Sequence, residues 1–403
     1  MTSGIAEVKV VSMIKILATG VKIEDNFGSP SILHGLQEVL AELYVNDYEL
    51  TYYQTTPFNE YSSRDFNFKI RTISLSYKNI GFALLRNKEM KEFIREVKSS
   101  DIAVDLYGIC FSDNLNSQKF SYLGMFANSV YTFRTLAIAK FFRRKTVKNT
   151  CSFGPMKSKL NQKSAAFACN HLFDVVSARE EKSCDALIYD AKVKKEILLS
   201  PDIANMMTSS NDKIFDESKI GISTSHQIIR QWKGKTGYVE CIINLCRHIS
   251  QTYGISIILI PNEVQQSSDM NDITVSREIQ DELKKEGIHV DIIDSAHMSS
   301  IELKNIIASC EVIVASRYHS CVAALSSGVP TLVVGWHYKY EELLHWYGQD
   351  GWGIPTGECT SEKLISTFNS FWEKRDESKK IIAEKYPEVR KAVIETGKIL
   401  FSK

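Results

Sequence analysis

Short apolar runs alternate with amphipathic stretches along most of this chain, and this alternation limits its fold more than any other feature. The segment MIKILAT, residues 13–19, predicts a buried strand, and residues 30–44 predict the amphipathic helix that follows it. The apolar runs at residues 101–110 and 173–179 predict further strands of the same half. Strands that alternate with helices in this way are typical of an α/β protein with parallel sheets.

A polar segment, TSSNDKIFDES at residues 208–218, interrupts the alternation, which then restarts. The second half predicts strands at residues 219–224, 255–261, 289–294, 311–316 and 330–336, with helices at 237–254, 276–287, 299–310 and 319–328. We therefore predict two Rossmann-like domains, residues 1–210 and 211–403, that face each other across a cleft, each with a mostly parallel sheet. The last segment, residues 387–403, has a helical period and is expected to pack back on the first domain.

Several short signals predict where helices begin and end. Ser29 is a natural N-cap and Pro30 a natural first helical residue. Ser299 and Glu302 have the spacing of a capping box, and Gly328 is placed to end the helix that precedes it.

Composition excludes several classes of protein. The 49 basic residues nearly balance the 48 acidic ones, so no overall field favours nucleic acid or an anionic membrane. No apolar run approaches the roughly 18 residues of a transmembrane helix, and the N-terminus does not have the pattern of a signal peptide. The nine cysteines fit no zinc pattern and lie mostly inside apolar runs, which predicts buried thiols in a reducing, cytoplasmic compartment. No compact His, Asp and Glu cluster predicts a metal site.

The stretch VIVASRYHSCVAAL, residues 312–325, places Arg317 and His319 between a predicted strand and a predicted helix. The carboxyl edge of a parallel sheet is where open α/β folds bind ligands, and a helix N-terminus there attracts anions. Arg317 and His319 therefore predict a site for an anionic ligand. The alternative is that Arg317 pairs with a surface carboxylate and His319 only caps the helix.

Other residues repeat this arrangement at predicted strand ends. Arg179 follows the strand at residues 173–179, and Lys339 follows the strand at residues 330–336. Gly154 stands in a Gly-Pro turn, and the loop EDNFGSPSI could bring backbone close to a ligand. Taken singly, Arg179 could pair with Glu180 or Glu181, and Lys339 could be a solvated surface residue.

Taken in order, these pieces resemble the polysaccharide pyruvyl transferase family. The matching pieces are NFGSPSI, SFGP, VVSAREEKS, SPDIA and, most specific, the block ELKNIIASCEVIVASRYHSCVAALSSGVPTLVVGWHYKYEELLHWYG. The resemblance implies transfer of the enolpyruvyl group of phosphoenolpyruvate to a sugar of a surface polysaccharide or its precursor. The products are a pyruvate ketal and phosphate. The family is similar in architecture to two-domain glycosyltransferases of the GT-B type.

The resemblance implies roles for particular residues. Arg317 and Arg179 would clamp the anionic donor from opposite sides of the cleft, with Ser316 beside it and Lys339 on the leaving phosphate. His319, with an ordinary imidazole pKa near 6.5, would transfer the proton. The remaining positions expected to line the cleft are Asn26, Gly28, Ser29, Gly154 and Tyr318. No cofactor is inferred beyond the donor itself.

Ser29 departs from the family pattern, which commonly has Asp after the loop glycine. This departure keeps open a non-catalytic carbohydrate-binding protein of the same fold. The shared architecture keeps open a second alternative, a GT-B glycosyltransferase that uses a nucleotide sugar. The basic segment AKFFRRKTVKN, residues 139–149, could touch a membrane that carries a lipid-linked acceptor, or could be a solvated helix end. The acceptor sugar, its linkage and the oligomeric state are not encoded in any recognisable motif.

Overall fold

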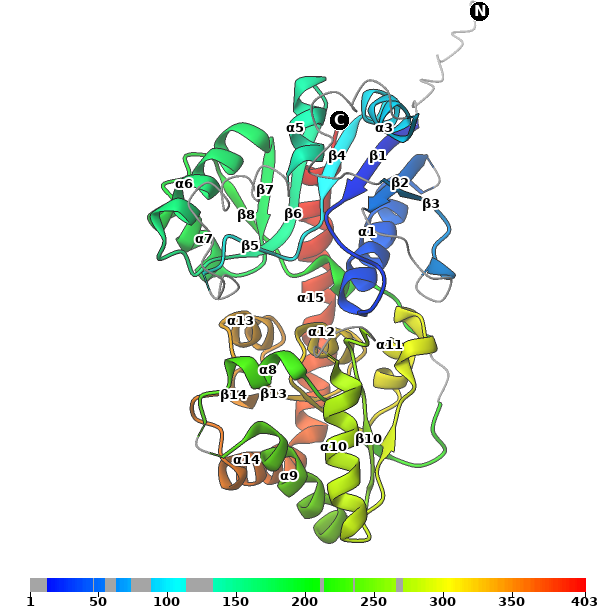
Figure 1. The fold of residues 1–403 in the computed structure, drawn as a ribbon, viewed down its shortest axis with the longest axis vertical. Helices are drawn as coiled ribbons and strands as arrows, with labels where there is room; N and C mark the ends of the chain where they lie inside the picture. The colour runs from blue at the N-terminus through cyan, green and yellow to red at the C-terminus, as the bar shows by residue number, and fades with distance from the viewer. Residues whose placement is uncertain are drawn as a thin grey trace, which may run out of the picture.

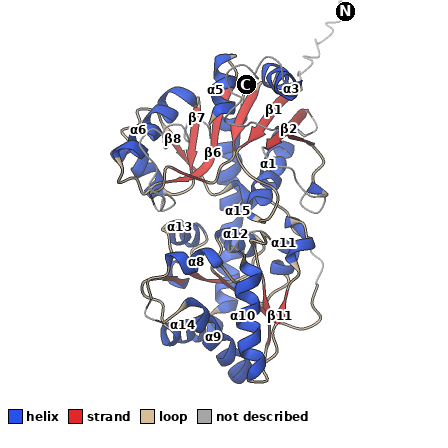
Figure 2. Ribbon diagram, in the orientation of Figure 1, coloured by secondary structure: helices blue, strands red, loops and turns tan. Residues whose placement is uncertain are grey.

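The computed structural model describes residues 13–45, 47–54, 63–73, 88–113, 133–210, 214–234, 236–265 and 271–403. Within these residues the strands form two sheets, which lie at opposite ends of the elongated molecule with helices around both (Figures 1 and 2). Every strand pair in both sheets is parallel. This confirms the α/β class predicted from the alternation of strands and helices.

The first sheet has the order β3-β2-β1-β4-β6-β7-β8, and β5 pairs with β6. Its strands are β1 (Ile14–Thr19), β2 (Tyr48–Gln54), β3 (Lys69–Thr72), β4 (Ile102–Asp105), β5 (Ile109–Cys110), β6 (Lys145–Phe153), β7 (Val175–Ala178) and β8 (Ile197–Leu199). The strand order reverses direction between β1 and β4. At such a point the two connections leave on opposite faces, which opens a crevice at the carboxyl edge.

The second sheet has the order β11-β10-β9-β12-β13-β14 and reverses between β9 and β12. Its strands are β9 (Lys219–Ser223), β10 (Ser256–Leu259), β11 (Asp291–Ile292), β12 (Val312–Ala315), β13 (Thr331–Gly335) and β14 (Gly353–Pro355). The chain passes from the first sheet to the second between β8 and β9, and the predicted boundary at residue 210 lies in this connection. The strand that ends before Arg317 is therefore one of the two strands at the reversal.

Helices cover both sheets. Those of the first half are α1 (Gly28–Tyr44), α3 (Lys88–Ser99), α5 (Arg134–Phe141), α6 (Lys159–Phe167) and α7 (Glu181–Asp185). Those of the second half are α8 (His226–Gln231), α9 (Tyr238–Tyr253), α10 (Asp272–Lys285), α11 (Ser300–Ala308), α12 (Tyr318–Leu325), α13 (Lys339–Trp346), α14 (Ser361–Glu373) and α15 (Arg375–Phe401).

The helix-end predictions were partly right. The capping box of Ser299 and Glu302 is present in both directions, and Gly328 adopts a φ of +77° just beyond α12. Ser29 as N-cap was wrong, because α1 begins at Gly28 and includes Ser29. The carbonyl oxygen of the Asn26 side chain accepts from the Ser29 N–H at 2.9 Å instead. The first turn is therefore satisfied by a side chain just before the helix.

The last helix, α15, runs along both halves of the molecule (Figure 1). At the start of α15, Arg375 pairs with Glu311 beside the second sheet. Further along the helix, Arg390 pairs with Glu42 of α1. At its end, the Tyr44 hydroxyl donates to the Phe401 carbonyl at 2.5 Å. The C-terminal segment thus packs against α1 of the first half.

One apolar core crosses from the first half to the second. It joins residues of β1 and α1 to residues of α12 and α15, among them Ile16, Leu36, Val322 and Ile394. A large apolar interface opposes free hinge motion between domains. Eight of the nine cysteines are buried and Cys184 is partly exposed, which agrees with a packing role. None of the helices among the described residues is long and apolar enough to cross a membrane.

Candidate active site

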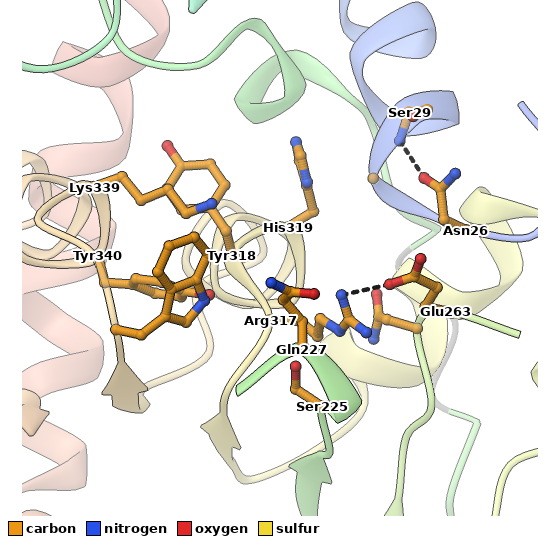
Figure 3. A pocket seen from close by; sticks show the side chains of 13 residues that line it. Asn26, Ser29, Ser225, Gln227, Glu263, Arg317, Tyr318, His319, Lys339 and Tyr340 are labelled. Carbon is orange, nitrogen blue, oxygen red and sulfur yellow. Dashed lines mark hydrogen bonds and ion pairs between the residues drawn. The ribbon is translucent and has the colours of Figure 1, made fainter. Parts of the chain in front are cut away.

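Two pockets lie between the two sheets and share three residues. The pocket on the side of the second sheet has a volume of about 240 Å³ and is lined by Asn26, Gly28, Ser29, Ser225, Gln227, Asn262, Glu263, Arg317, Tyr318, His319, Trp336, Lys339 and Tyr340 (Figure 3). We call it the C pocket. The pocket on the side of the first sheet, the N pocket, has a volume of about 530 Å³. Ser29, His319 and Lys339 line both pockets, so the two form one continuous cleft.

The N pocket collects residues that follow the carboxyl ends of the first sheet. Its lining includes Thr19, Gly20, Val21, Lys22, Ile32, Tyr53, Gln54, Tyr107, Gly108, Ile109, Arg134, Thr135 and Arg179. These residues come mainly from the ends of β1, β2 and β4, next to the reversal in strand order. The C pocket lies at the corresponding reversal of the second sheet, where Ser225 follows β9 and Arg317 follows β12. Both crevices therefore open on the same cleft.

Arg317 occupies the C pocket, as predicted, but two carboxylates already hold it. Its Nε and Nη2 donate to the two oxygens of Asp272 at 2.9 and 2.6 Å. Its Nη1 forms an ion pair with Glu263 at 2.7 Å, drawn as a dashed line in Figure 3. The structure thus shows the pairing with carboxylates that was the alternative interpretation, although Asp272 is buried and not at the surface. The anionic ligand stays a prediction. The fork geometry of arginine suits this double engagement.

Arg179 lines the N pocket and is almost completely buried. Its Nε donates to the Ser152 hydroxyl at 2.8 Å and to Glu180 at 2.9 Å, and its Nη1 donates to Asp202. Its guanidinium carbon lies 4.3 Å from the centre of the Tyr318 ring. Arg179 thus points towards the second half, as expected, but internal carboxylates neutralise it.

His319 stands at the junction of the two pockets with a free ring nitrogen. Its Nε2 is buried without a hydrogen-bond partner among the described residues, and the nearest carboxylate oxygen, on Asp202, is 3.8 Å away. Burial lowers the pKa of His319 to about 4, against the opposing effect of Asp202 and with help from Arg179 and Lys339. The pKa of His319 is therefore well below the 6.5 expected from the sequence, and the imidazole is neutral at pH 7.

Lys339 forms no ion pair with the described residues. Within the described part of the chain, its amine contacts only aromatic rings, at 5.2 Å from Tyr318, 5.1 Å from Trp336 and 5.4 Å from Tyr340. Burial and the nearby Arg179 lower the pKa of Lys339 to about 7. An amine in this position can bind an anion or exchange a proton near neutral pH.

The loop before α1 reaches across to the second half. Asn26 forms an antiparallel bridge with Glu263, and the Val264 N–H donates to the Asp25 carbonyl at 2.9 Å. Asn26 also holds the loop through its amide, which donates to the Lys22 and Glu24 carbonyls. This contact places Gly28 and Ser29 beside His319.

Two predicted positions lie beside the cleft and not in the lining of these two pockets. The Ser316 hydroxyl is 1% exposed and accepts from Tyr238 at 3.0 Å, so it serves the packing below the pocket. Gly154 adopts a φ of +85°, and its carbonyl lies 3.4 Å from His337 Nε2. Tyr338 donates to the adjacent Phe153 carbonyl at 2.5 Å, so the SFGP turn forms part of the contact between the two halves.

Sequence reasoning missed the acidic partners of the two arginines. Asp202 was visible in the SPDIA motif but received no role, and Glu180 was considered only as a surface partner. Asp272 and Glu263 gave no signal, because each lies far from Arg317 in the sequence. Trp336 and Tyr340 were also missed, although both lie within the block that carried the resemblance. Among the described residues, no group of His, Cys, Asp and Glu side chains is arranged to hold a metal ion.

Comparisons with solved structures define the class of fold. The chain resembles the UDP-GlcNAc 2-epimerase from Neisseria meningitidis bound to UDP-GlcNAc, with 13% identity and a TM-score of 0.58 over 96% of this chain and 100% of that chain. It also resembles a glycosyltransferase from Rickettsia africae, with 11% identity and a TM-score of 0.57 over 97% and 99%. The ADP-heptose heptosyltransferase II from E. coli gives 12% identity and a TM-score of 0.50 over 90% and 100%. The protein thus has the GT-B arrangement of two Rossmann-like domains.

The sequence gives the particular family. The model of the polysaccharide pyruvyl transferase family matches residues 26–338, and the chain belongs to that family. This confirms the resemblance found in the motifs. No curated protein matches the chain by sequence.

Proposed function

We propose that this transferase moves the enolpyruvyl group of phosphoenolpyruvate onto two hydroxyls of a sugar in a surface polysaccharide or its precursor. One observation carries this proposal: Lys339 and His319 both line the two pockets, and within the described residues neither the Lys339 amine nor His319 Nε2 has a hydrogen-bond partner. A reaction that joins an anionic donor to a saccharide needs a cation and a base at the boundary between two substrate sites.

The donor fits the C pocket and its junction with the N pocket. Phosphoenolpyruvate carries a carboxylate and a phosphate, about −2.5 to −3 charges at neutral pH. Lys339 would bind the phosphate, since its amine has no counter-ion to displace. Arg317 would face the donor from the second half, and Arg179 would lie behind Tyr318 on the first half. The negative donor would also raise the pKa of His319 from about 4 and that of Lys339 from about 7.

The acceptor fits the N pocket, which has about twice the volume of the C pocket. Tyr53 and Tyr107 offer aromatic rings, and Gln54 and Thr135 offer neutral hydrogen-bonding groups. Aromatic faces beside neutral polar groups suit a sugar ring with several hydroxyls. The proposal includes an acceptor sugar that is linked to a lipid. It also places the protein in the cytoplasm, at the inner face of the membrane.

The proposed chemistry balances without a cofactor. C3 of the donor gains a proton and becomes a methyl group, one sugar hydroxyl attacks C2, and phosphate leaves. A second hydroxyl then attacks C2 to close the ketal. Of the two hydroxyl protons, one replaces the proton given to C3 and the other leaves with phosphate. His319 and Lys339 are the two groups at the junction that can carry these protons.

Thermal shift measurements with phosphoenolpyruvate, with a panel of nucleotide sugars and with free saccharides test this proposal. A ligand at a hundred times its dissociation constant stabilises the folded protein by about 2.7 kcal/mol. We expect a shift with phosphoenolpyruvate. A shift with a nucleotide sugar and none with phosphoenolpyruvate would favour a glycosyltransferase, and a shift with saccharides alone would favour a carbohydrate-binding protein.

A further inference from the structure

Two carboxylates hold Arg317, and they differ in how firmly they are fixed. Asp272 is fully buried and accepts five hydrogen bonds: two from Arg317 and one each from the N–H groups of His226, Asn262 and Glu263. A carboxylate with this many donors cannot leave without exposing several unpaired N–H groups. Asp272 is therefore a permanent partner that sets the orientation of the guanidinium.

Glu263 is the exchangeable partner. Its side chain is 24% exposed in the C pocket, and within the described residues its carboxylate contacts only Arg317. Its backbone is anchored separately, because it pairs with Asn26 and donates to Asp272. The side chain can therefore rotate away from Arg317 while the contact between the two halves of the molecule is kept.

The charges around Arg317 also oppose an incoming anion. One guanidinium and two carboxylates sum to −1 while Glu263 is in place, and to zero when it has turned away. An anionic ligand that approaches Arg317 therefore meets repulsion until the Glu263 carboxylate moves.

We infer that Glu263 is a specificity-determining residue that occupies the place of the donor carboxylate on Arg317. The inference rests on the proposed function, because it requires the donor to enter the C pocket. A ligand with a carboxylate alone must displace Glu263 with no other gain. A ligand that adds a phosphate also binds the amine of Lys339, which offsets the loss of the Glu263–Arg317 ion pair, so that a donor with both groups can enter where a carboxylate alone binds too weakly.

Glu263→Gln tests this inference, because it keeps the size of the side chain and removes the competing charge. Calorimetry should show that the variant binds phosphoenolpyruvate about tenfold more tightly than the parent, the equivalent of about 1.4 kcal/mol. Pyruvate, which has the carboxylate without the phosphate, should gain by a similar factor, because it displaces the same carboxylate. The matched control is Glu358→Gln, which removes an exposed carboxylate paired with Lys363 outside both pockets.

The outcomes separate the two proposals. If the parent binds phosphoenolpyruvate and a folded Glu263→Gln variant binds it equally or more weakly, the role of Glu263 is wrong and the proposed function stands. If neither protein binds phosphoenolpyruvate, the proposed function fails and the role of Glu263 fails with it. A gain in affinity cannot come from lost structure, so tighter binding by the variant supports the inference directly.

Discussion

Gly28 of α1 lies directly against the imidazole of His319, although the two residues belong to opposite halves of the molecule. A Cβ on Gly28 would lie 2.3 Å from His319 Nδ1, closer than any real contact allows. The absence of a side chain at residue 28 therefore lets the ring stand at the junction of the two pockets. Gly28 in one half of the molecule therefore determines where the His319 ring can lie in the other half.

Gly28→Ala should displace the His319 ring. Overpacking of this kind costs about 1–3 kcal/mol, and a shifted ring loses its alignment with the substrates. We expect reduced turnover at nearly unchanged secondary structure, measured by phosphate release and circular dichroism. Gly351→Ala is the control, because a Cβ there meets nothing within 4 Å. Parent activity in Gly28→Ala would contradict this role.

His319→Ala should leave donor binding largely intact and lower turnover by roughly 10²–10⁴-fold, the usual worth of a general acid–base group. The reason is that Nε2 of His319 is free to take a proton, whereas Lys339 supplies the positive charge and Arg317 the N–H donors for the carboxylate. Calorimetry with phosphoenolpyruvate and a pyruvylation assay give the two readings. If the variant transfers pyruvate at the parent rate, the imidazole has no catalytic role and serves only in packing.

Lys339→Met should weaken donor binding, because it removes the unpaired cation while keeping an unbranched chain among the three rings. Hydrogen bonds to charged groups contribute about 1.5–3 kcal/mol, so the dissociation constant should rise about ten- to a hundredfold or more. Lys182→Met is a suitable control, since Lys182 pairs with Glu341 outside both pockets. Equal losses in the two variants would show that the effect is one of overall charge.

Arg317→Lys should impair both the fold of the site and donor binding, even though the charge is kept. An ammonium group cannot give Asp272 two parallel hydrogen bonds, so part of a buried carboxylate would be left unpaired. We expect a lower urea midpoint and weaker binding of phosphoenolpyruvate. A variant with parent stability and parent affinity would show that the fork is not needed.

Stability should fall as the pH drops from about 6.5 towards 4. Burial lowers the pKa of His34 to about 4, and that of His337 to about 3. Below pH 6.5 the unfolded chain binds protons that the folded chain excludes, which favours unfolding. Between pH 7.5 and 5, His34→Leu should remove about 2 kcal/mol of this dependence, seen as a smaller change in urea midpoint over that interval. The exposed His289 provides the control: His289→Leu should retain the full dependence of the parent.

Much of the fold could be predicted from the sequence, because the period of apolar residues depends only on local geometry. The strands that end before Arg179, Arg317 and Lys339 were correctly predicted, and so was the capping box at Ser299. The first turn of α1 could not be read in this way. Ser29 has a side chain suited to an N-cap, but the helix begins at Gly28. It starts directly after residues 25 and 26, which are held in place by their contact with residues 263 and 264.

The pattern of strands was enough to predict that Arg179, Arg317, His319 and Lys339 come to the cleft, since carboxyl ends of parallel strands share one edge. Their charge partners could be found only in the folded protein. Arg317 pairs with Asp272 and Glu263, Arg179 pairs with Glu180 and Asp202, and Lys339 has only aromatic rings around its amine among the described residues. Charge pairing and burial depend on side chains brought together from distant parts of the chain. For that reason the residue with the weakest motif, Lys339, became the unpaired cation of the site.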